Sequence, residues 1–218
     1  MKIARLVPSA KAQGRWLCYL EDGTILRVSE SEVLDFGLYS GMELDEGGIG
    51  ALTAAAGKSA LREKALNLIA ARPMSRRELI KKLNARGRGE KEREPGEEEE
   101  AGGAAAEVAD WLEGLGYLND AEYARSLARH YSAKGYGQGK IRDELWRRGV
   151  PREYWDEAQA SSRPPDEGID AFLRQKLKCR APDPKELKRA ADALKRRGYR
   201  WDEIREGLRR YGAQVEDE

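Results

Sequence analysis

Residues 135–140 carry the sequence most suggestive of chemistry, Gly-Tyr-Gly-Gln-Gly-Lys. Glycines followed by a lysine can cradle phosphate with their backbone N–H groups, so a nucleotide site is the first hypothesis to weigh. A Walker A loop, however, has the pattern G-x-x-x-x-G-K followed by Ser or Thr. Here Lys134 stands at the first glycine position and Ile141 follows the lysine. The sequence therefore predicts a tight connection between two helices here, and no nucleotide site.

Other catalytic chemistry has little support. His130 is the only histidine, which argues against a histidine-dependent triad and against a metal site with several histidine ligands. The two cysteines, Cys18 and Cys179, fall in separate predicted domains, without the spacing of a zinc site or a disulfide scaffold. Most carboxylates alternate with Lys or Arg at the spacing of ordinary helix-surface pairs. We therefore predict no enzymatic activity, no cofactor and no bound metal.

The basic residues are more informative. The net charge is only +1, but residues 58–89 hold ten Lys or Arg against two Glu, and residues 90–100 hold seven Glu against two basic residues. Cations that repeat on one flank of successive helices can line up for a phosphate backbone or an acidic protein groove. The alternative is that they only keep exposed helix faces soluble. The candidate binding residues are Arg76, Arg77, Lys81, Lys82, Lys140, Arg142, Arg147, Arg148, Arg205, Arg209 and Arg210.

A repeated helical pattern must position these candidates. Three stretches place two apolar residues four apart and a glycine four residues later, at offsets of 62 and 63 residues. Such spacing is typical of a helix with one buried face and a glycine stop. Three copies predict a repeat array, which usually presents an extended surface to a macromolecule. The copies are Leu79-Leu83-Gly87, Ile141-Leu145-Gly149 and Ile204-Leu208-Gly212.

The first 57 residues differ from the rest. An Asp-Gly turn joins two strand-like runs and predicts a hairpin, with a third strand before it. Ser29 with Glu32 three residues later predicts a capping box that opens a short helix. Helical structure is then expected to begin near Asp45 or Lys58. The predicted strands are residues 3–7, 15–20 and 24–28.

Nine helices in three groups of three are predicted after this unit. The expected fold class is mainly α, with three tandem three-helix repeat units forming an elongated array after a small β-rich unit. The expected helices are residues 59–71, 75–86, 104–115, 120–134, 138–148, 151–160, 166–179, 184–197 and 201–211. The expected domains are residues 1–57 (the β-hairpin unit), then 58–118, 119–163 and 164–218 (the three repeats).

An acidic stretch at residues 88–103 interrupts the first group. Its glutamates, Pro95 and four glycines cannot bury apolar area, so a disordered insertion is predicted. One interpretation is a decoy that folds over the neighbouring basic segment and competes with nucleic acid. The other is a solvated insertion with no role beyond solubility.

The aromatic residues divide into two predicted roles. Trp111, Tyr117 and Tyr123 are expected in a core face. Tryptophans near helix ends are expected to pack one helix or module against the next, because a large rigid ring fills such seams well. The alternative for an exposed tryptophan is stacking on a nucleic-acid base. The tryptophans near helix ends are Trp146, Trp155 and Trp201.

No apolar run approaches the roughly 20 residues of a membrane span. The N-terminus also lacks the apolar core of a signal peptide. The expectation is a soluble, reduced, cytoplasmic protein without a membrane partner.

Several motifs together resemble the bacterial regulatory protein RecX family. The stretch Gly116–Ala124, with the sequence Gly-Tyr-Leu-Asn-Asp-Ala-Glu-Tyr-Ala, is similar to that family's signature, as is the continuation from Lys134 to Pro151. The segment from Arg72 to Leu83 is similar to its first-unit motif. The likeness covers most of residues 15–160 well and the last unit loosely, and the acidic insertion departs from it.

The resemblance implies a modulator of the RecA recombinase, built of three tandem three-helix units that bind within the groove of the RecA–DNA filament. There the family restrains filament growth, ATP hydrolysis, strand exchange and the co-protease activity behind the SOS response. The implied partners are the RecA filament and its single-stranded DNA, with a monomeric chain and contacts chiefly through the basic middle helices. Two alternatives stay open. They are a stand-alone nucleic-acid-binding protein, and an adaptor for another protein that binds through the β-rich unit.

Overall fold

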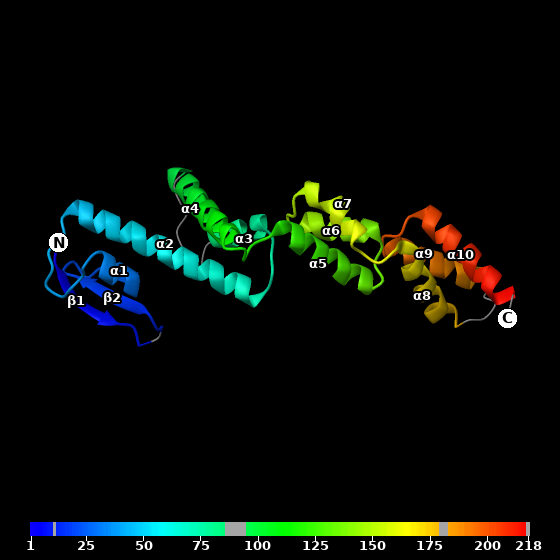
Figure 1. The fold of residues 1–218 in the computed structure, drawn as a ribbon, viewed down its shortest axis with the longest axis horizontal. Coiled ribbons are helices and arrows are strands. Elements are labelled where there is room, and N and C mark those ends of the chain that lie inside the picture. Colours follow the sequence, from blue (N-terminus) through cyan, green and yellow to red (C-terminus); the bar gives the residue numbers. More distant parts are fainter. Residues whose placement is uncertain (11, 86–94, 179–182, 217–218) are drawn as a thin grey trace. The chain divides into compact units, whose positions relative to one another are not determined.

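The structure is a computed structural model that describes residues 1–10, 12–85, 95–178 and 183–216 (Figure 1). The chain divides into two compact units. The first is Met1–Arg72 with Ile80–Leu112, and the second is Pro73–Leu79 with Glu113–Glu218. Most described residues are helical and one small antiparallel sheet stands at the N-terminus, so the predicted fold class is confirmed in these respects.

The first unit begins with an antiparallel sheet in the order β1-β2-β3. Asp22 fixes the turn between β2 and β3, because its carboxylate accepts hydrogen bonds from the N–H and the hydroxyl of Thr24. Gly23 completes this turn with a φ of 86°. The predicted hairpin and third strand are confirmed as β1 (Ile3–Pro8), β2 (Arg15–Leu20) and β3 (Ile25–Ser29). One face of the sheet contributes the buried residues Ile3, Cys18, Leu20 and Val28.

A capping box opens α1 (Glu30–Asp35) directly after the sheet, as predicted. The Ser29 hydroxyl accepts from the N–H of Glu32, and the Glu32 carboxylate accepts from the N–H of Ser29 at 2.7 Å. Glu32 also accepts a hydrogen bond from Ser59 of the next helix. This hydrogen bond joins α1 to the helix that follows it.

That helix, α2 (Glu46–Ala71), is 26 residues long and begins directly after Asp45. Of the two expected starts of helical structure, the one near Asp45 is therefore confirmed, and the helix start at residue 59 is wrong. The glycines of α2 lower intrinsic helix propensity by about 1 kcal/mol each and weaken the signal of its first half in the sequence. Asp45 caps it by accepting from the N–H of Gly48 at 2.7 Å, and Leu52 and Ala56 are buried in the core of the sheet. Tertiary burial thus outweighs local propensity. Residues 57 and 58, between which a domain boundary is expected, both lie inside α2.

The second half of α2 packs with α3 (Arg76–Asn84) and α4 (Pro95–Gly114). Lys64 Nζ donates to the carbonyl of Leu83 at 3.0 Å, and the Arg62 guanidinium lies 4.9 Å from the centre of the Trp111 ring. Through these two contacts, the C-terminal half of α2 is joined to both α3 and α4.

The prediction of disorder over residues 88–103 is wrong for residues 95–103, which belong to α4. Proline suits the first turn of a helix because its missing N–H needs no partner there. Glutamates in the following turn favour the positive end of the helix dipole. The acidic composition therefore suits a helix start. Residues 86–94 lie outside the described part of the chain.

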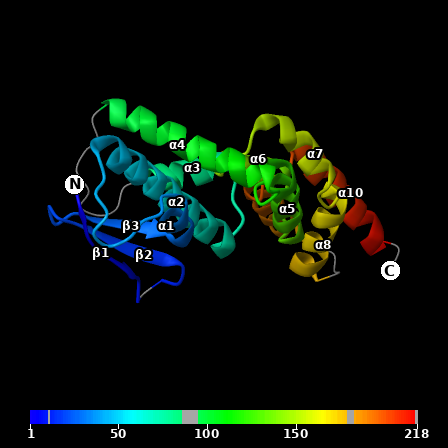
Figure 2. The same cartoon turned by 60° about the vertical axis from the view of Figure 1, so that its left-hand side comes forward.

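The second unit contains two three-helix groups, which appear as separate clusters in Figure 1. In Figure 2, turned by 60°, the two groups overlap. The first has its own core around Ala124, Ile141 and Leu145, and the second around Ile169, Leu173 and Leu194. The predicted second and third helix groups are confirmed to within a few residues at most ends. Their elements are α5 (Asp120–Ala133), α6 (Gln138–Arg147), the 3-10 turn η1 (Arg152–Tyr154), α7 (Trp155–Ala160), α8 (Pro165–Leu177), α9 (Pro184–Arg196) and α10 (Trp201–Glu216).

The repeat pattern correctly identifies buried positions but only one glycine stop. The first apolar position of each copy is fully or almost fully buried. Gly149 ends α6 with a φ of 69°, whereas Gly212 lies inside α10, so the predicted end of that helix at residue 211 is wrong. Gly87 lies outside the described residues. The buried first positions are Leu79, Ile141 and Ile204.

Two tryptophans do not pack as predicted. Trp146 is 68% exposed and Trp201 is 58% exposed, so neither cements one module to the next. Consecutive helix residues point about 100° apart, and Leu145 already faces the core, which turns Trp146 outward. Trp155 does join the core of its group, and its indole N–H donates to the carbonyl of Val150 at 3.0 Å.

The predicted core face around Trp111 is correct only in part. Leu112 and Tyr123 are buried, and Trp111 is half-buried under the Arg62 guanidinium. Tyr117 is exposed, because it follows the turn at Gly116 that ends α4.

Leu145→Ala tests the core of the second three-helix group. Leu145 is fully buried, so we expect the free energy of unfolding to fall by roughly 2–5 kcal/mol in a denaturant titration. The control is Leu115→Ala, which truncates an exposed leucine and should change stability by about 0.5 kcal/mol or less. Equal losses for the two variants would show that the core is assigned to the wrong positions.

Candidate functional site

Three of the four candidate cations on α6 and its C-cap lie around one buried carboxylate. Arg147 Nη2 lies 2.5 and 2.6 Å from the two carboxylate oxygens of Glu144, and Lys140 Nζ lies 3.7 Å from Oε1. Arg148 Nε lies 3.9 Å from Oε2, and its Nη1 donates to the hydroxyl of Tyr123 at 3.1 Å. The Glu144 side chain is only 4% exposed. Because a buried charge must be paired, these cations have a structural task.

The ionisation of Glu144 follows from this environment. Burial alone would raise its pKa, but hydrogen bonds from Arg147 and Tyr131, with the attraction of Arg147 and Lys140, hold the pKa below its ordinary value of 4.5. Glu144 is therefore a carboxylate at neutral pH and offsets part of the positive charge around it.

The fourth candidate, Arg142, lies 3.6 Å from a carboxylate oxygen of Asp156.

Two of the three candidates on α10 are also paired. Arg210 Nη2 lies 2.8 Å from Asp170 Oδ1 and links α10 to α8. Arg209 donates two hydrogen bonds, of 3.0 and 2.8 Å, to Glu206 on its own helix. Arg205 is exposed, and no described carboxylate lies within ion-pair distance of it.

The α3 candidates have different surroundings. The backbone N–H of Arg76 donates to Asp120 at 2.8 Å, and its guanidinium lies 3.6 Å from Glu113. Arg77 is exposed, with its side-chain carbons against Gly149, where an added Cβ would lie 3.0 Å from Cδ.

The structure thus separates the candidates by their partners. Lys82, which is partly exposed, has a polar or electrostatic contact of its own. In the described ranges, Arg77, Lys81 and Arg205 are the exposed candidates without a carboxylate partner. Paired surface charges contribute little to a long-range field. These three residues are consequently the candidates best suited to attract an anionic partner.

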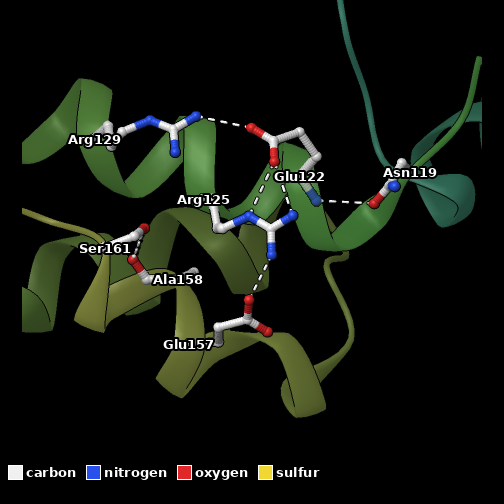
Figure 3. Close-up of polar contacts among 7 residues, drawn as sticks. All are labelled: Asn119, Glu122, Arg125, Arg129, Glu157, Ala158 and Ser161. Atoms are coloured by element: carbon white, nitrogen blue, oxygen red, sulfur yellow. Dashed lines mark hydrogen bonds and ion pairs between the residues drawn. The ribbon is translucent and has the colours of Figure 1, made fainter.

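A further ion network outside the candidates ties α5 to α7 (Figure 3). Glu122 accepts from Arg125 Nε at 3.0 Å and from Arg129 Nη2 at 2.8 Å. Arg125 also reaches Glu157 of α7, with Nη1 2.5 Å from Oε1. Asn119 caps α5 by accepting from the N–H of Glu122 at 2.9 Å. This side of the module is therefore internally neutralised.

The glycine-rich stretch at residues 135–140 is a helix connection, as predicted, and it also joins two modules. The N–H groups of Gly137 and Gly139 donate to the carbonyls of Arg197 and Gly198 at 2.8 and 2.9 Å. An added Cβ on Gly198 would lie 2.3 Å from the backbone nitrogen of Lys140. Glycine is required here because two backbones meet directly. The donors that a phosphate loop would offer are already used.

Arg197, at the end of α9, also stabilises the contact between the second and third helix groups. Its guanidinium donates to the carbonyl of Gly135 at 3.2 Å and lies 4.8 Å from the centre of the Phe172 ring. The sequence shows Arg197 as one more basic residue, whereas the structure uses it to hold the second and third helix groups together.

The described residues offer neither a metal site nor a membrane span. Over the described ranges, no group of three or more His, Cys, Asp or Glu side chains could hold a metal ion. No helix in the same ranges is long and apolar enough to cross a bilayer.

Comparisons with known proteins agree on one family. Residues 119–158 match the family model for the second three-helix domain of RecX. The regulatory protein RecX of Pseudomonas putida KT2440 is 32% identical over 147 residues, which cover 66% of this chain and 86% of the relative. The RecX of Stenotrophomonas maltophilia strain R551-3 is 33% identical over 149 residues, covering 67% and 84%.

Solved structures show the same fold. A crystal structure of regulatory protein RecX matches with a TM-score of 0.62 at 22% identity, covering 100% of this chain and 99% of that one. RecX from Lactobacillus salivarius matches with a TM-score of 0.57 at 17% identity, covering 73% and 99%.

Glu144→Gln tests the buried ion cluster. The folded-state pKa of Glu144 is below its ordinary value of 4.5, so its contribution to stability is full above that value and is lost as pH falls through the folded pKa. At pH 7 the variant should lose about 1.5–3 kcal/mol of unfolding free energy. Its stability should also fall less steeply than the parent's below pH 4.5. Asp143→Asn, at an exposed neighbour on α6, is the control and should behave like the parent. A parallel acid profile for parent and Glu144→Gln would contradict the assignment.

Gly198→Ala tests the backbone seam. Gly198 and Gly116 have φ values of 88° and 76°, so alanine at either should cost about 1–2 kcal/mol in backbone strain. Only at Gly198 does the added Cβ meet another backbone. Its substitution should therefore cost about 1–3 kcal/mol more than Gly116→Ala in chemical denaturation. The seam would be misplaced if the two variants lost the same stability.

Proposed function

Because this chain belongs to the RecX family of regulatory proteins, we propose that it is a non-enzymatic regulator of the RecA recombinase. In this proposal it binds in the helical groove of the filament that RecA forms on single-stranded DNA. There it inhibits ATP hydrolysis, strand exchange and the co-protease activity, and so modulates DNA repair and the SOS response. The chain acts as a monomer in the cytoplasm.

The observation that carries the proposal is the set of exposed cations without carboxylate partners. Arg77 and Lys81 lie four residues apart on α3, and Arg205 lies on α10. A groove lined by DNA phosphates and protein surface attracts such unpaired charges over a range of about 10 Å at moderate salt. The stem of Arg77 rests on Gly149, which leaves its guanidinium exposed in a restricted position.

In this proposal the paired candidates stabilise the fold, and the unpaired ones make the contact with the partner. Lys140, Arg147 and Arg148 hold the buried Glu144, and Arg210 holds α10 against α8. Removing one of them would unpair a carboxylate and disturb the module. Their substitution consequently cannot separate binding from folding, whereas substitution of unpaired cations can.

The central test is inhibition of RecA's ATPase on single-stranded DNA by Arg77→Gln/Lys81→Gln. We expect the concentration for half-inhibition to rise roughly tenfold, with an unchanged helical spectrum, because two long-range attractions are removed and no core is opened. The matched control is Arg129→Gln/Arg163→Gln. It removes the same charge from exposed arginines that already pair with Glu122 and Glu167, and it should inhibit like the parent.

Two outcomes would refute the proposal. Unchanged inhibition by Arg77→Gln/Lys81→Gln would rule out contact through α3. A parent protein that binds DNA but not RecA filaments in a pull-down would favour the stand-alone nucleic-acid-binding alternative, and one that binds neither would favour an adaptor for another protein.

A further inference from the structure

The strongest unpaired charge in the third module lies on α9, outside the candidate set. This helix buries Ala190, Ala191 and Leu194 in the module's core. The opposite face carries basic residues at positions 185, 188, 189, 195 and 196. With about 100° between consecutive helix residues, all five side chains project from one side of the helix. We call this surface the α9 stripe. It consists of five exposed residues, Lys185, Lys188, Arg189, Lys195 and Arg196.

The cations of the α9 stripe are not used within the described structure. No described carboxylate lies within ion-pair distance of any of them, in contrast to the arginines of α10 and α6. Two acidic residues lie between Lys185 and Arg196, namely Glu186, whose carboxylate completes the capping box, and Asp192, so this segment carries a net charge of +3. Such a surface attracts an extended anion.

Helix stability does not explain this placement. Lys195 and Arg196 lie in the last turn, where cations favour the negative end of the helix dipole. Lys185, Lys188 and Arg189 lie in the first half, where that benefit is absent and the first-turn lysine is unfavourable. The helix start is instead stabilised by the capping box of Asp183 and Glu186.

We propose that the α9 stripe binds the phosphate backbone of a single nucleic-acid strand. At 1.5 Å per residue the stripe is about 17 Å long. This length spans about five phosphates of a strand whose stacked bases keep the 3.4 Å rise of B-form DNA. It is lysine-rich and has no aromatic or aliphatic anchor. Protein–protein interfaces are depleted in lysine and depend on buried aromatic and arginine anchors, so a phosphate backbone fits this face better than an acidic protein groove.

This inference extends the proposed function, since it assigns DNA contact to a surface that acts without RecA. The test therefore omits RecA and measures fluorescence anisotropy of labelled oligo(dT) with the full chain at salt concentrations from about 50 to 200 mM. The parent should bind, and its affinity should fall steeply with salt. Lys185→Gln/Lys188→Gln/Arg189→Gln should bind roughly tenfold or more weakly at low salt, with a salt slope smaller by about 2.

The control is Arg129→Gln/Arg163→Gln/Arg200→Gln, which removes the same net charge from exposed arginines that carboxylates already hold. It should keep the parent's affinity and salt slope. Circular dichroism should show the same helical content for all three proteins.

Four results would overturn the inference. They are parental binding by the α9 variant, an equal loss by the control, no binding of oligo(dT) by the parent, and displacement of oligo(dT) by polyglutamate as readily as by unlabelled strand. The last would assign the stripe to an acidic protein. If RecA inhibition persists while oligo(dT) binding is absent, the proposed function stands and the α9 assignment falls.

Discussion

A buried carboxylate has to be paired, and this constraint decides which cations of the protein can serve a partner. Glu144 takes up Arg147, Lys140 and Arg148. Asp170, which is only partly buried, pairs with Arg210 and so links α8 to α10. Ion pairing thus stabilises each module from inside and removes most candidate cations from the field that an anionic partner meets.

Glycine provides the second constraint, at the seam between the second and third helix groups. The direct hydrogen bonds from Gly137 and Gly139 to the turn after α9 leave no room for side chains. Arg197 covers this contact with its guanidinium. The two modules of the second unit are therefore connected through backbone as well as side chains, and the base of α9 is fixed by the same contact.

Local signals predict much of this fold, because they act within a few residues. The Asp-Gly hairpin and the capping box at Ser29 both appear where the sequence predicts them. The start of α2 stays open between Asp45 and Lys58 in the sequence, because glycines weaken the signal of a helix that tertiary burial stabilises. The exposure of Trp146 depends on the helical phase set by its neighbour Leu145, which composition does not show.

The candidate site is harder to predict, since a basic residue looks the same in the sequence whether or not a carboxylate lies beside it. Glu144 pairs with residues three and four positions away, which spacing can suggest. Asp170 and Arg210 are 40 residues apart, and only the packing of α8 on α10 brings them together. The α9 stripe differs from these helices because no described carboxylate pairs with its cations.

The central claim is that cations without carboxylate partners make the contact with the filament. Lysine acetylation footprinting of the chain, free and bound to RecA filaments on single-stranded DNA, tests it directly. The account predicts that Lys81, Lys185 and Lys188 lose reactivity in the complex, whereas Lys58, which already pairs with Glu107 at 3.0 Å, reacts equally in both states. Unchanged reactivity of the three unpaired lysines in a saturated complex would contradict it.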